Sequence, residues 1–207
     1  MRWQIKNILT ILIILPLVVL GGCEQAQLEP ISAQGTILAF GDSLTVGVGT
    51  TAANSYPSIL AQLCDRTVVN GGISGETTAQ GLKRLPQLLA ETEPELLLLL
   101  EGGNDILRNH DPAQTKRNLA TMIEYAQDMG IQVVLIAVPQ KNLFSSQTMF
   151  YRELADQYHL VLIDDLIADL LRTLAYKSDA IHFNTKGYRA LAEQVYSVLK
   201  KQGALQE

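Results

Sequence analysis

The chain has 207 residues, of which 47% are hydrophobic and 18% charged, with a formal net charge of −5. These proportions exclude a disordered chain, and the length suits one domain with a sizeable core. Residues 1–22 hold two basic residues and no acidic one, which leaves 14 basic against 21 acidic residues and a net charge of −7 for the remainder. Because such an acidic chain is poorly suited to bind a polyanion, we expect no nucleic-acid partner.

The segment 1–22 is typical of an export signal, because basic residues precede a short apolar run at residues 8–20. Two glycines then lead directly into Cys23, a pattern that resembles the lipobox of bacterial lipoproteins, in which the cysteine is lipid-modified. A plain secretory signal with Cys23 as an incidental thiol and an uncleaved amino-terminal anchor are the alternatives. We expect an exported lipoprotein, anchored to a membrane through Cys23 and facing the periplasm or the cell exterior, with residues 23–34 as a polar tether.

From residue 35 onward, short apolar runs alternate with helical patterns. The apolar runs predict strands at residues 36–40, 67–70, 95–101, 131–138 and 160–163. Apolar spacing of three and four predicts helices at residues 56–64, about 82–89, 112–129, about 150–158 and from about 184 onward. This alternation predicts one domain at residues 35–207 with a three-layer α/β/α architecture and a flavodoxin-like, parallel, five-stranded sheet.

Three details of the helices follow from single residues. Asp111 and Pro112 suit the cap and first turn of the third helix, whose apolar face we expect to extend to Met129. Pro86 is expected to bend or restart the second helix. Cys64 lies in the apolar pattern of the first helix, so we expect it to be a small buried residue.

The first three strands are each followed by residues suited to acyl-transfer chemistry. Ser43 follows the first strand, Gly75 lies in the loop after the second, and Asn104 follows the third in the stretch Gly-Gly-Asn-Asp. Because the carboxyl ends of parallel strands share one edge, these loops are expected to meet. A serine needs a base to act as a nucleophile, and glycine N–H groups and an asparagine amide can stabilise an oxyanion. The second glycine of the G-x-S-x-G elbow is missing, which disfavours an ordinary α/β-hydrolase.

Histidine is the expected base, and the chain has three. His159 precedes the fifth strand, on the side away from Ser43, and His110 fits the start of a helix. His182 lies in a polar loop before the last helix, three residues after Asp179. One turn can therefore present both side chains, with the carboxylate fixing the tautomer of the imidazole.

Taken together, Gly-Asp-Ser-Leu, Asn-x-x-x-Ser-Gly-Glu-Thr, Gly-Gly-Asn-Asp and Asp-x-x-His resemble the GDSL, or SGNH, hydrolases, and most of all their bacterial thioesterases, lysophospholipases and arylesterases. The resemblance implies Ser43 as the nucleophile, His182 as the base and Asp179 as its partner. It also implies an oxyanion hole formed by the Ser43 N–H, the Gly75 N–H and the Asn104 side chain.

Other residues near these motifs have less specific roles. Asp42 and Asp105 are expected to order their loops, and Phe183 stands where a proline commonly follows the histidine in this family. An apolar acyl pocket is suggested by four hydrophobic residues in the loops after the third and fourth strands, Ile106, Leu107, Leu143 and Phe144.

The resemblance implies a monomeric serine esterase without metal or cofactor, which hydrolyses small-molecule or lipid acyl esters or thioesters through an acyl-serine intermediate. A carbohydrate O-acetylesterase of the same family is one alternative, because it would use the same site on another substrate. A non-catalytic module that holds an anion in its glycine loops is a second alternative. The chain has no G-x-x-x-x-G-K-[ST] pattern, which weakens the last of these.

Overall fold

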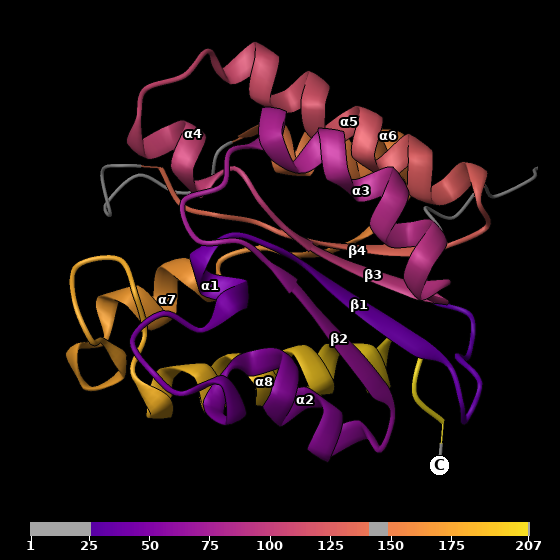
Figure 1. The fold of residues 1–207 in the computed structure, drawn as a ribbon, viewed down its shortest axis with the longest axis horizontal. Helices are drawn as coiled ribbons and strands as arrows, with labels where there is room; N and C mark the ends of the chain where they lie inside the picture. The colour runs from indigo at the N-terminus through magenta and orange to yellow at the C-terminus, as the bar shows by residue number, and fades with distance from the viewer. Residues whose placement is uncertain (1–25, 141–148, 207) are drawn as a thin grey trace, which may run out of the picture.

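The computed structural model describes residues 26–140 and 149–206, which form a parallel five-stranded sheet between two layers of helices (Figure 1). The sheet has the strand order β2-β1-β3-β4-β5, which is the flavodoxin-like order. The strands are β1 (Thr36–Gly41), β2 (Thr67–Gly72), β3 (Leu96–Leu100), β4 (Gln132–Ile136) and β5 (Val161–Ile163). The predicted α/β class and the five parallel strands are therefore confirmed.

Helices α3, α5 and α6 cover one face of the sheet, and α2, α7 and α8 cover the other (Figure 1). The α-helices are α1 (Ser43–Val46), α2 (Tyr56–Cys64), α3 (Thr78–Thr92), α4 (Gly103–Leu107), α5 (Pro112–Asp128), α6 (Met149–Tyr158), α7 (Leu166–Arg172) and α8 (Thr185–Lys201). Two 3₁₀ helices, η1 (Ala52–Asn54) and η2 (Leu174–Tyr176), lie in the connections. No helix within the described residues is long and apolar enough to cross a membrane.

The centre of the sheet is β3, whose five leucines are all buried. Leucine favours helix, but Pro94 and Gly102 leave too short a run for one. As a strand, β3 pairs with β1 and β4, and the helices on both faces of the sheet bury its side chains. Because β1 and β3 are neighbouring parallel strands, the glycine-bearing loops that follow them lie next to each other at the carboxyl edge of the sheet.

Two helix predictions need correction. Helix α3 runs without interruption from Thr78 to Thr92, so the restart expected as one possibility at Pro86 is wrong. A capping box of Thr77 and Gln80 fixes its start, and Leu85 and Leu89 on its apolar face are buried. Helix α5 is capped as predicted by Asp111, whose side chain accepts a hydrogen bond from the Ala113 N–H at 3.0 Å. Its apolar face ends earlier than predicted, because Met129 follows the last helical turn and is exposed.

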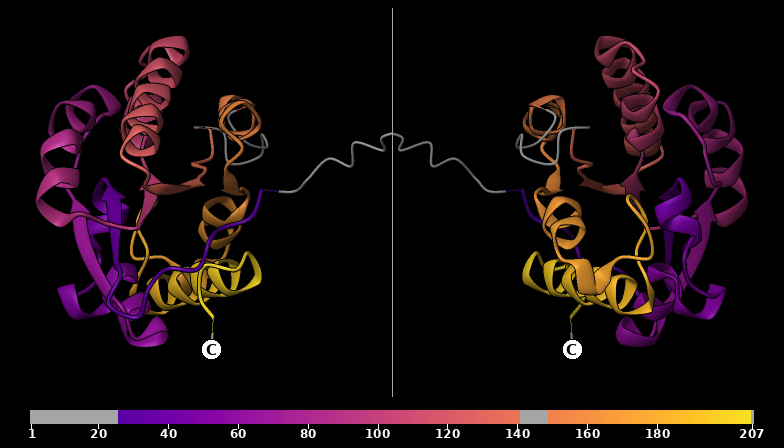
Figure 2. Two further views of the ribbon diagram at one scale, coloured as in Figure 1. Left: turned by 90° about the vertical axis from the view of Figure 1, so that its right-hand side faces the viewer. Right: turned by 90° about the vertical axis from the view of Figure 1, so that its left-hand side faces the viewer.

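The predicted tether is also partly wrong, because residues from Leu28 onward pack on the domain. Leu28 and Ile31 are buried in the core, and their N–H groups donate to the carbonyls of Gln202 and Ala204 at 2.8 and 2.9 Å. Figure 2 shows this segment running along the side from which the strands start, opposite the serine loop. Two apolar side chains three residues apart thus pack into the core beside the last residues of the chain, which composition alone did not indicate.

Candidate active site

Ser43 is delivered by a sharp turn between β1 and α1. The turn needs Gly41, since a Cβ there would lie 2.2 Å from the Leu100 carbonyl oxygen. Asp42 is the N-cap of α1 and accepts a hydrogen bond from the Leu44 N–H at 3.0 Å. Ser43 is the first residue of the helix, so its own N–H has no carbonyl one turn earlier to bind. The hydroxyl and a free backbone donor therefore lie together at the carboxyl edge of the sheet.

Ser43, His182 and Asp179 form one hydrogen-bonded chain. The His182 Nε2 lies 3.0 Å from the Ser43 Oγ, and the His182 Nδ1 lies 2.8 Å from the Asp179 Oδ2. When Nδ1 carries the proton and donates to the carboxylate, Nε2 is left as an acceptor for the serine hydroxyl. The structure thus brings Ser43 into contact with His182, 139 positions further along the chain, and with it the neighbouring Asp179.

The Asp179 carboxylate also holds the backbone of its own turn. Its Oδ1 accepts hydrogen bonds from the N–H groups of Ile181 and His182 at 2.8 and 2.9 Å. The hydrogen bond from the His182 ring is the largest of the effects that lower the pKa of Asp179, to about 2. Asp179 is therefore ionised throughout the neutral range and can fix the orientation of the imidazole.

Phe183 stabilises the histidine loop in place of the proline that is common in the family. Its side chain is fully buried and packs edge-to-face on Tyr188 of α8, with ring centroids 5.5 Å apart. Burial of a phenylalanine contributes about 1.5–3 kcal/mol. The loop is also closed by a hydrogen bond from the Ser178 N–H to the His182 carbonyl at 3.0 Å. His182 is therefore held by the backbone hydrogen bond from Ser178 and by the buried side chain of its neighbour Phe183.

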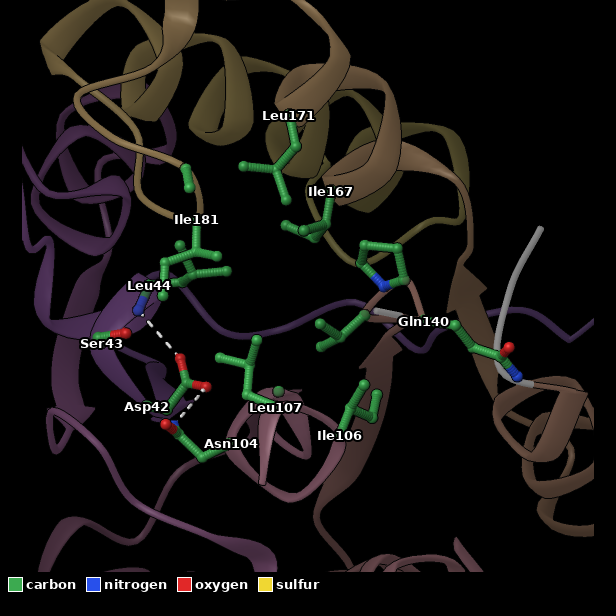
Figure 3. A pocket seen from close by; sticks show the side chains of 14 residues that line it. Asp42, Ser43, Leu44, Asn104, Ile106, Leu107, Gln140, Ile167, Leu171 and Ile181 are labelled. Atoms are coloured by element: carbon green, nitrogen blue, oxygen red, sulfur yellow. Dashed lines mark hydrogen bonds between the residues drawn. The ribbon is translucent and has the colours of Figure 1, made fainter. Parts of the chain in front are cut away.

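Asn104 lies in α4 and points toward the same cavity as Ser43 (Figure 3). Its Nδ2 donates to the Asp42 Oδ2 at 3.2 Å, which orients the amide and leaves its second hydrogen available. The close approach requires Gly103, where a Cβ would lie 3.0 Å from the same carboxylate oxygen. Burial raises the pKa of Asp42 to about 6, and the Leu44 N–H and His182 partly oppose this shift. Asp42 thus orders both loops, as predicted.

Gly75 and Asp105 occupy the neighbouring loops. Gly75 has a φ of +77°, which favours glycine, and its carbonyl accepts a hydrogen bond from Arg108 at 2.9 Å. It is not among the residues that line the cavity, so its N–H remains a predicted oxyanion donor. Asp105 is buried and accepts hydrogen bonds from the N–H and hydroxyl of Thr78, both at 2.8 Å, which agrees with its predicted structural role.

A cavity of about 100 Å³ opens beside Ser43 and is mostly apolar. Ile106 and Leu107 line it as predicted, whereas Leu143 and Phe144 lie outside the described residues. Helix α7 adds two side chains that the sequence reasoning missed. A signal was present, because apolar residues after Asp165 recur at helical spacing. Among the described residues, the lining comprises Asp42, Ser43, Leu44, Gly103, Asn104, Ile106, Leu107, Val138, Pro139, Gln140, Ile167, Leu171, Ala180 and Ile181.

The remaining candidate side chains lie elsewhere. His159 is exposed after α6, and His110 is exposed before α5 with its Nδ1 3.6 Å from the Asp105 Oδ1. Cys64 is a buried free thiol, as predicted. Within the described residues, no group of three or more His, Cys, Asp or Glu side chains is arranged to hold a metal ion. Cys23 lies outside the described residues.

The sheet order and the serine, histidine and aspartate at its carboxyl edge place the protein in the SGNH hydrolase fold class. Residues 39–190 match the sequence model described as the GDSL-like Lipase/Acylhydrolase family, and the chain belongs to this family. A crystal structure of TesA superposes with a TM-score of 0.73 and 30% identity, covering 81% of this chain and 99% of that chain.

Curated relatives agree with this assignment. The chain is 41% identical to the arylesterase of Vibrio mimicus over 126 residues, which are 58% of this chain and 63% of the relative. That match spans less than two thirds of the Vibrio protein. Identity to thioesterase 1/protease 1/lysophospholipase L1 of Escherichia coli K12 is 31% over 170 residues, 78% of this chain and 82% of the relative. The uncharacterized lipoprotein YqeF of Bacillus subtilis is 30% identical over 139 residues, 61% of this chain and 55% of that protein.

Proposed function

We propose that the protein is a serine ester hydrolase that cleaves acyl esters or thioesters through an acyl-enzyme on Ser43. The observation that carries the proposal is the hydrogen-bonded chain from Ser43 through His182 to Asp179, next to an apolar cavity. The family membership and relatives named as esterases and a thioesterase support it.

In the first half-reaction, the Ser43 Oγ attacks the acyl carbonyl carbon while its proton passes to the His182 Nε2. The alcohol or thiol then leaves with that proton, and the acyl group remains on Ser43. In the second half-reaction, water gives a proton to His182 and attacks the acyl-serine ester. The carboxylic acid departs, and Ser43 regains its proton. Asp179 stabilises the imidazolium in both halves without taking the proton itself.

Three donors are proposed to stabilise the negative oxygen of each tetrahedral intermediate. The Ser43 N–H lies at the start of α1, and the second amide hydrogen of Asn104 is free of its Asp42 contact. The Gly75 N–H is the third proposed donor. Donors that are fixed before the reaction stabilise the developing charge without reorganisation, and Asp42 and Gly103 hold Asn104 in this way.

The cavity favours an acyl chain over a sugar ring as the group held beside Ser43. Its volume of about 100 Å³ far exceeds the space that one water needs, and aliphatic side chains form most of its wall. An aliphatic chain there buries apolar surface without leaving hydroxyl groups unpaired. This lining supports an esterase of lipid-like or aryl substrates over a carbohydrate O-acetylesterase.

The test is hydrolysis of p-nitrophenyl esters from acetyl to palmitoyl by the chain starting after Cys23. We expect turnover that requires Ser43 and a maximum kcat/KM at chains longer than acetyl, because the cavity rewards added methylenes by about 0.8 kcal/mol each until it is full. A rate confined to the acetyl ester would favour the carbohydrate esterase. No hydrolysis at any acyl-chain length would favour the non-catalytic module that binds an anion.

Anchoring through a lipid on Cys23 is a further proposal, supported by the lipobox-like sequence and by a relative named as a lipoprotein. Because Leu28 is packed on the domain, only five chain steps separate it from Cys23. These steps span at most about 18 Å, which would keep the exported domain close to its membrane. The docked segment lies where the strands start, at the end of the sheet opposite the loop that carries Ser43 (Figure 2).

We expect Cys23→Ser to abolish incorporation of labelled palmitate by cells that express the full chain, since the thioether attachment needs the sulfur atom. The measurement is autoradiography of the immunoprecipitated protein. Cys64→Ser is the matched control, because the Cys64 thiol is buried and should leave labelling intact. Equal labelling of the Cys23→Ser variant would reject the lipid anchor.

A further inference from the structure

Glu101 is a buried acid that the proposed reaction does not use. It lies directly between β3 and α4, the helix that carries Asn104, and its side chain is fully buried. The Glu101 Oε2 accepts a hydrogen bond from the Gly102 N–H at 3.1 Å, and the Glu101 carbonyl accepts one from the Tyr151 hydroxyl at 2.6 Å. The Glu101 Oε1 has no donor among the described residues. An ionised carboxylate would be costly here, because one of its oxygens would lack a donor.

The charged groups around Glu101 also oppose its ionisation. Burial is the main cause that raises the pKa of Glu101 to about 10, and the negative charges of Asp42 in the serine turn and Glu76 in the β2–α3 loop add to this shift. Glu76 is itself buried. Arg84 does not compensate Glu101 directly, because its guanidinium binds Glu76 and the Gly71 carbonyl.

Two further titratable groups face this region. Asp105 of α4 accepts hydrogen bonds from Thr78, and its negative charge, like that of Asp42, acts on Tyr151 of α6. Burial and these carboxyl groups hold the pKa of Tyr151 well above its ordinary value. Tyr151 is therefore a neutral donor to the Glu101 carbonyl and supplies no positive charge.

We propose that Glu101 is a positioning residue that stays neutral and donates its carboxyl proton from Oε1 to the Glu76 carboxylate. In this arrangement the Glu101 Oε2 accepts from Gly102, Oε1 donates to Glu76, and Arg84 neutralises Glu76. The bond joins the β2–α3 loop to the β3–α4 loop. The inference rests on the proposed function, because the first loop carries Gly75 and the second leads into α4, which carries Asn104.

The position of this link explains why it would matter for catalysis. The same region is also held by Arg108, directly after α4, which donates to the Gly75 carbonyl, and by Thr78 at the start of α3, which donates to Asp105 of α4. The Glu101 carboxyl also accepts a hydrogen bond from the Gly102 N–H, so its position helps to fix the backbone that leads into Gly103 and Asn104. Loss of the proton from Glu101 would place two facing carboxylates between the loops and a negative charge near the developing oxyanion.

The first test compares Glu101→Leu with Glu101→Gln on p-nitrophenyl butyrate at pH 7.5. Glu101→Leu is expected to lower kcat by about 10- to 100-fold while KM changes by less than about threefold, because donors are displaced rather than removed. Glutamine keeps an oxygen for Gly102 and an N–H for Glu76, so Glu101→Gln should recover most of this loss. Equal kcat in the leucine variant and the wild type would overturn the proposal.

The second test uses pH, and its stability readout is independent of activity. Between about pH 4.5 and about pH 10 only the unfolded chain releases the Glu101 proton, so folding stability falls as pH rises through this window. The Tm of Glu101→Gln should therefore rise relative to the wild-type Tm from pH 5 to pH 9. A Tm difference that is constant across this range would reject a neutral Glu101, even if the leucine variant fails to fold.

The pH dependence of kcat is a second readout, measured in a pH-stat with methyl butyrate as the substrate. Wild-type kcat is expected to fall as pH approaches 10, and Glu101→Gln should lack this alkaline fall. Asp164→Asn is the matched control, an acid-to-amide change after β5 at another carboxyl with a raised pKa. It should keep the wild-type profile, and an identical alkaline fall in Glu101→Gln would contradict the inference. If Ser43→Ala retained full turnover, the proposed function itself would fail.

Discussion

Replacing Ser43 by alanine is expected to lower kcat/KM for p-nitrophenyl esters by about 10⁴- to 10⁶-fold and to abolish the burst of p-nitrophenol. The Ser43 Oγ is the atom proposed to form the acyl bond, and no other hydroxyl is hydrogen-bonded to His182 within the described residues. The residual rate would come from the oxyanion donors and substrate binding alone. Stopped-flow absorbance in the first turnover is the measurement, because it counts acyl-enzyme directly.

The fold should survive this change, since the backbone of Ser43 keeps its place in α1 and only the hydrogen bond to His182 is lost. Equal Tm values for the two proteins would show that the loss is chemical. Ser58→Ala is the matched control, because the hydroxyl of Ser58 on α2 donates to the Ala52 carbonyl of η1, and Ser58 does not line the cavity. A burst of unchanged amplitude in Ser43→Ala would place the nucleophile at another residue.

Replacing Asn104 by alanine is expected to lower kcat by about 10²- to 10³-fold with little change in KM. This is the loss expected when one hydrogen-bond donor is removed from an oxyanion hole. The Asn104 amide points into the cavity beside Ser43, and Asp42 fixes it there through a hydrogen bond of 3.2 Å. Because the charge on the oxygen develops only in the transition state, the loss should appear in kcat and not in ground-state binding. Steady-state kinetics with p-nitrophenyl butyrate separates the two parameters.

A comparison variant distinguishes this role from a general effect of losing an amide. Gln132→Ala removes an amide that exchanges hydrogen bonds with Glu29 at the opposite edge of the sheet. It is expected to lower Tm without a comparable loss in kcat. A kcat loss well under tenfold in Asn104→Ala would remove Asn104 from the oxyanion hole.

The elements that the sequence predicted are those whose patterns depend on neighbours along the chain. The Leu96–Leu100 run between Pro94 and Gly102 could only be a buried strand. The cap at Asp111 and the turn at Gly130 similarly bound α5. Local rules suffice at such positions because short-range sterics and hydrogen bonds decide them. Met129 was misplaced because the helix ends one residue earlier.

The principal residues of the candidate site could also be read from the sequence, for a topological reason. Parallel strands send every following loop to one edge, so Ser43 and Asn104 had to be neighbours once the alternation of strands and helices was recognised. The three-residue spacing of Asp179 and His182 sets their own contact. The distance of 3.0 Å between His182 and Ser43 could not be read in this way, because it depends on how α8 packs against the sheet.

The sequence by itself therefore determined the fold class, the family and the side chains that meet at the carboxyl edge. Only the tertiary structure decided that Leu28 and Ile31 join the core, that α7 walls the cavity, that Phe183 anchors the histidine loop and that Glu101 is buried beside Glu76. Each of these depends on contacts between residues far apart in the chain. Such contacts are set by the shape of the packed interior, which no local pattern of residues encodes.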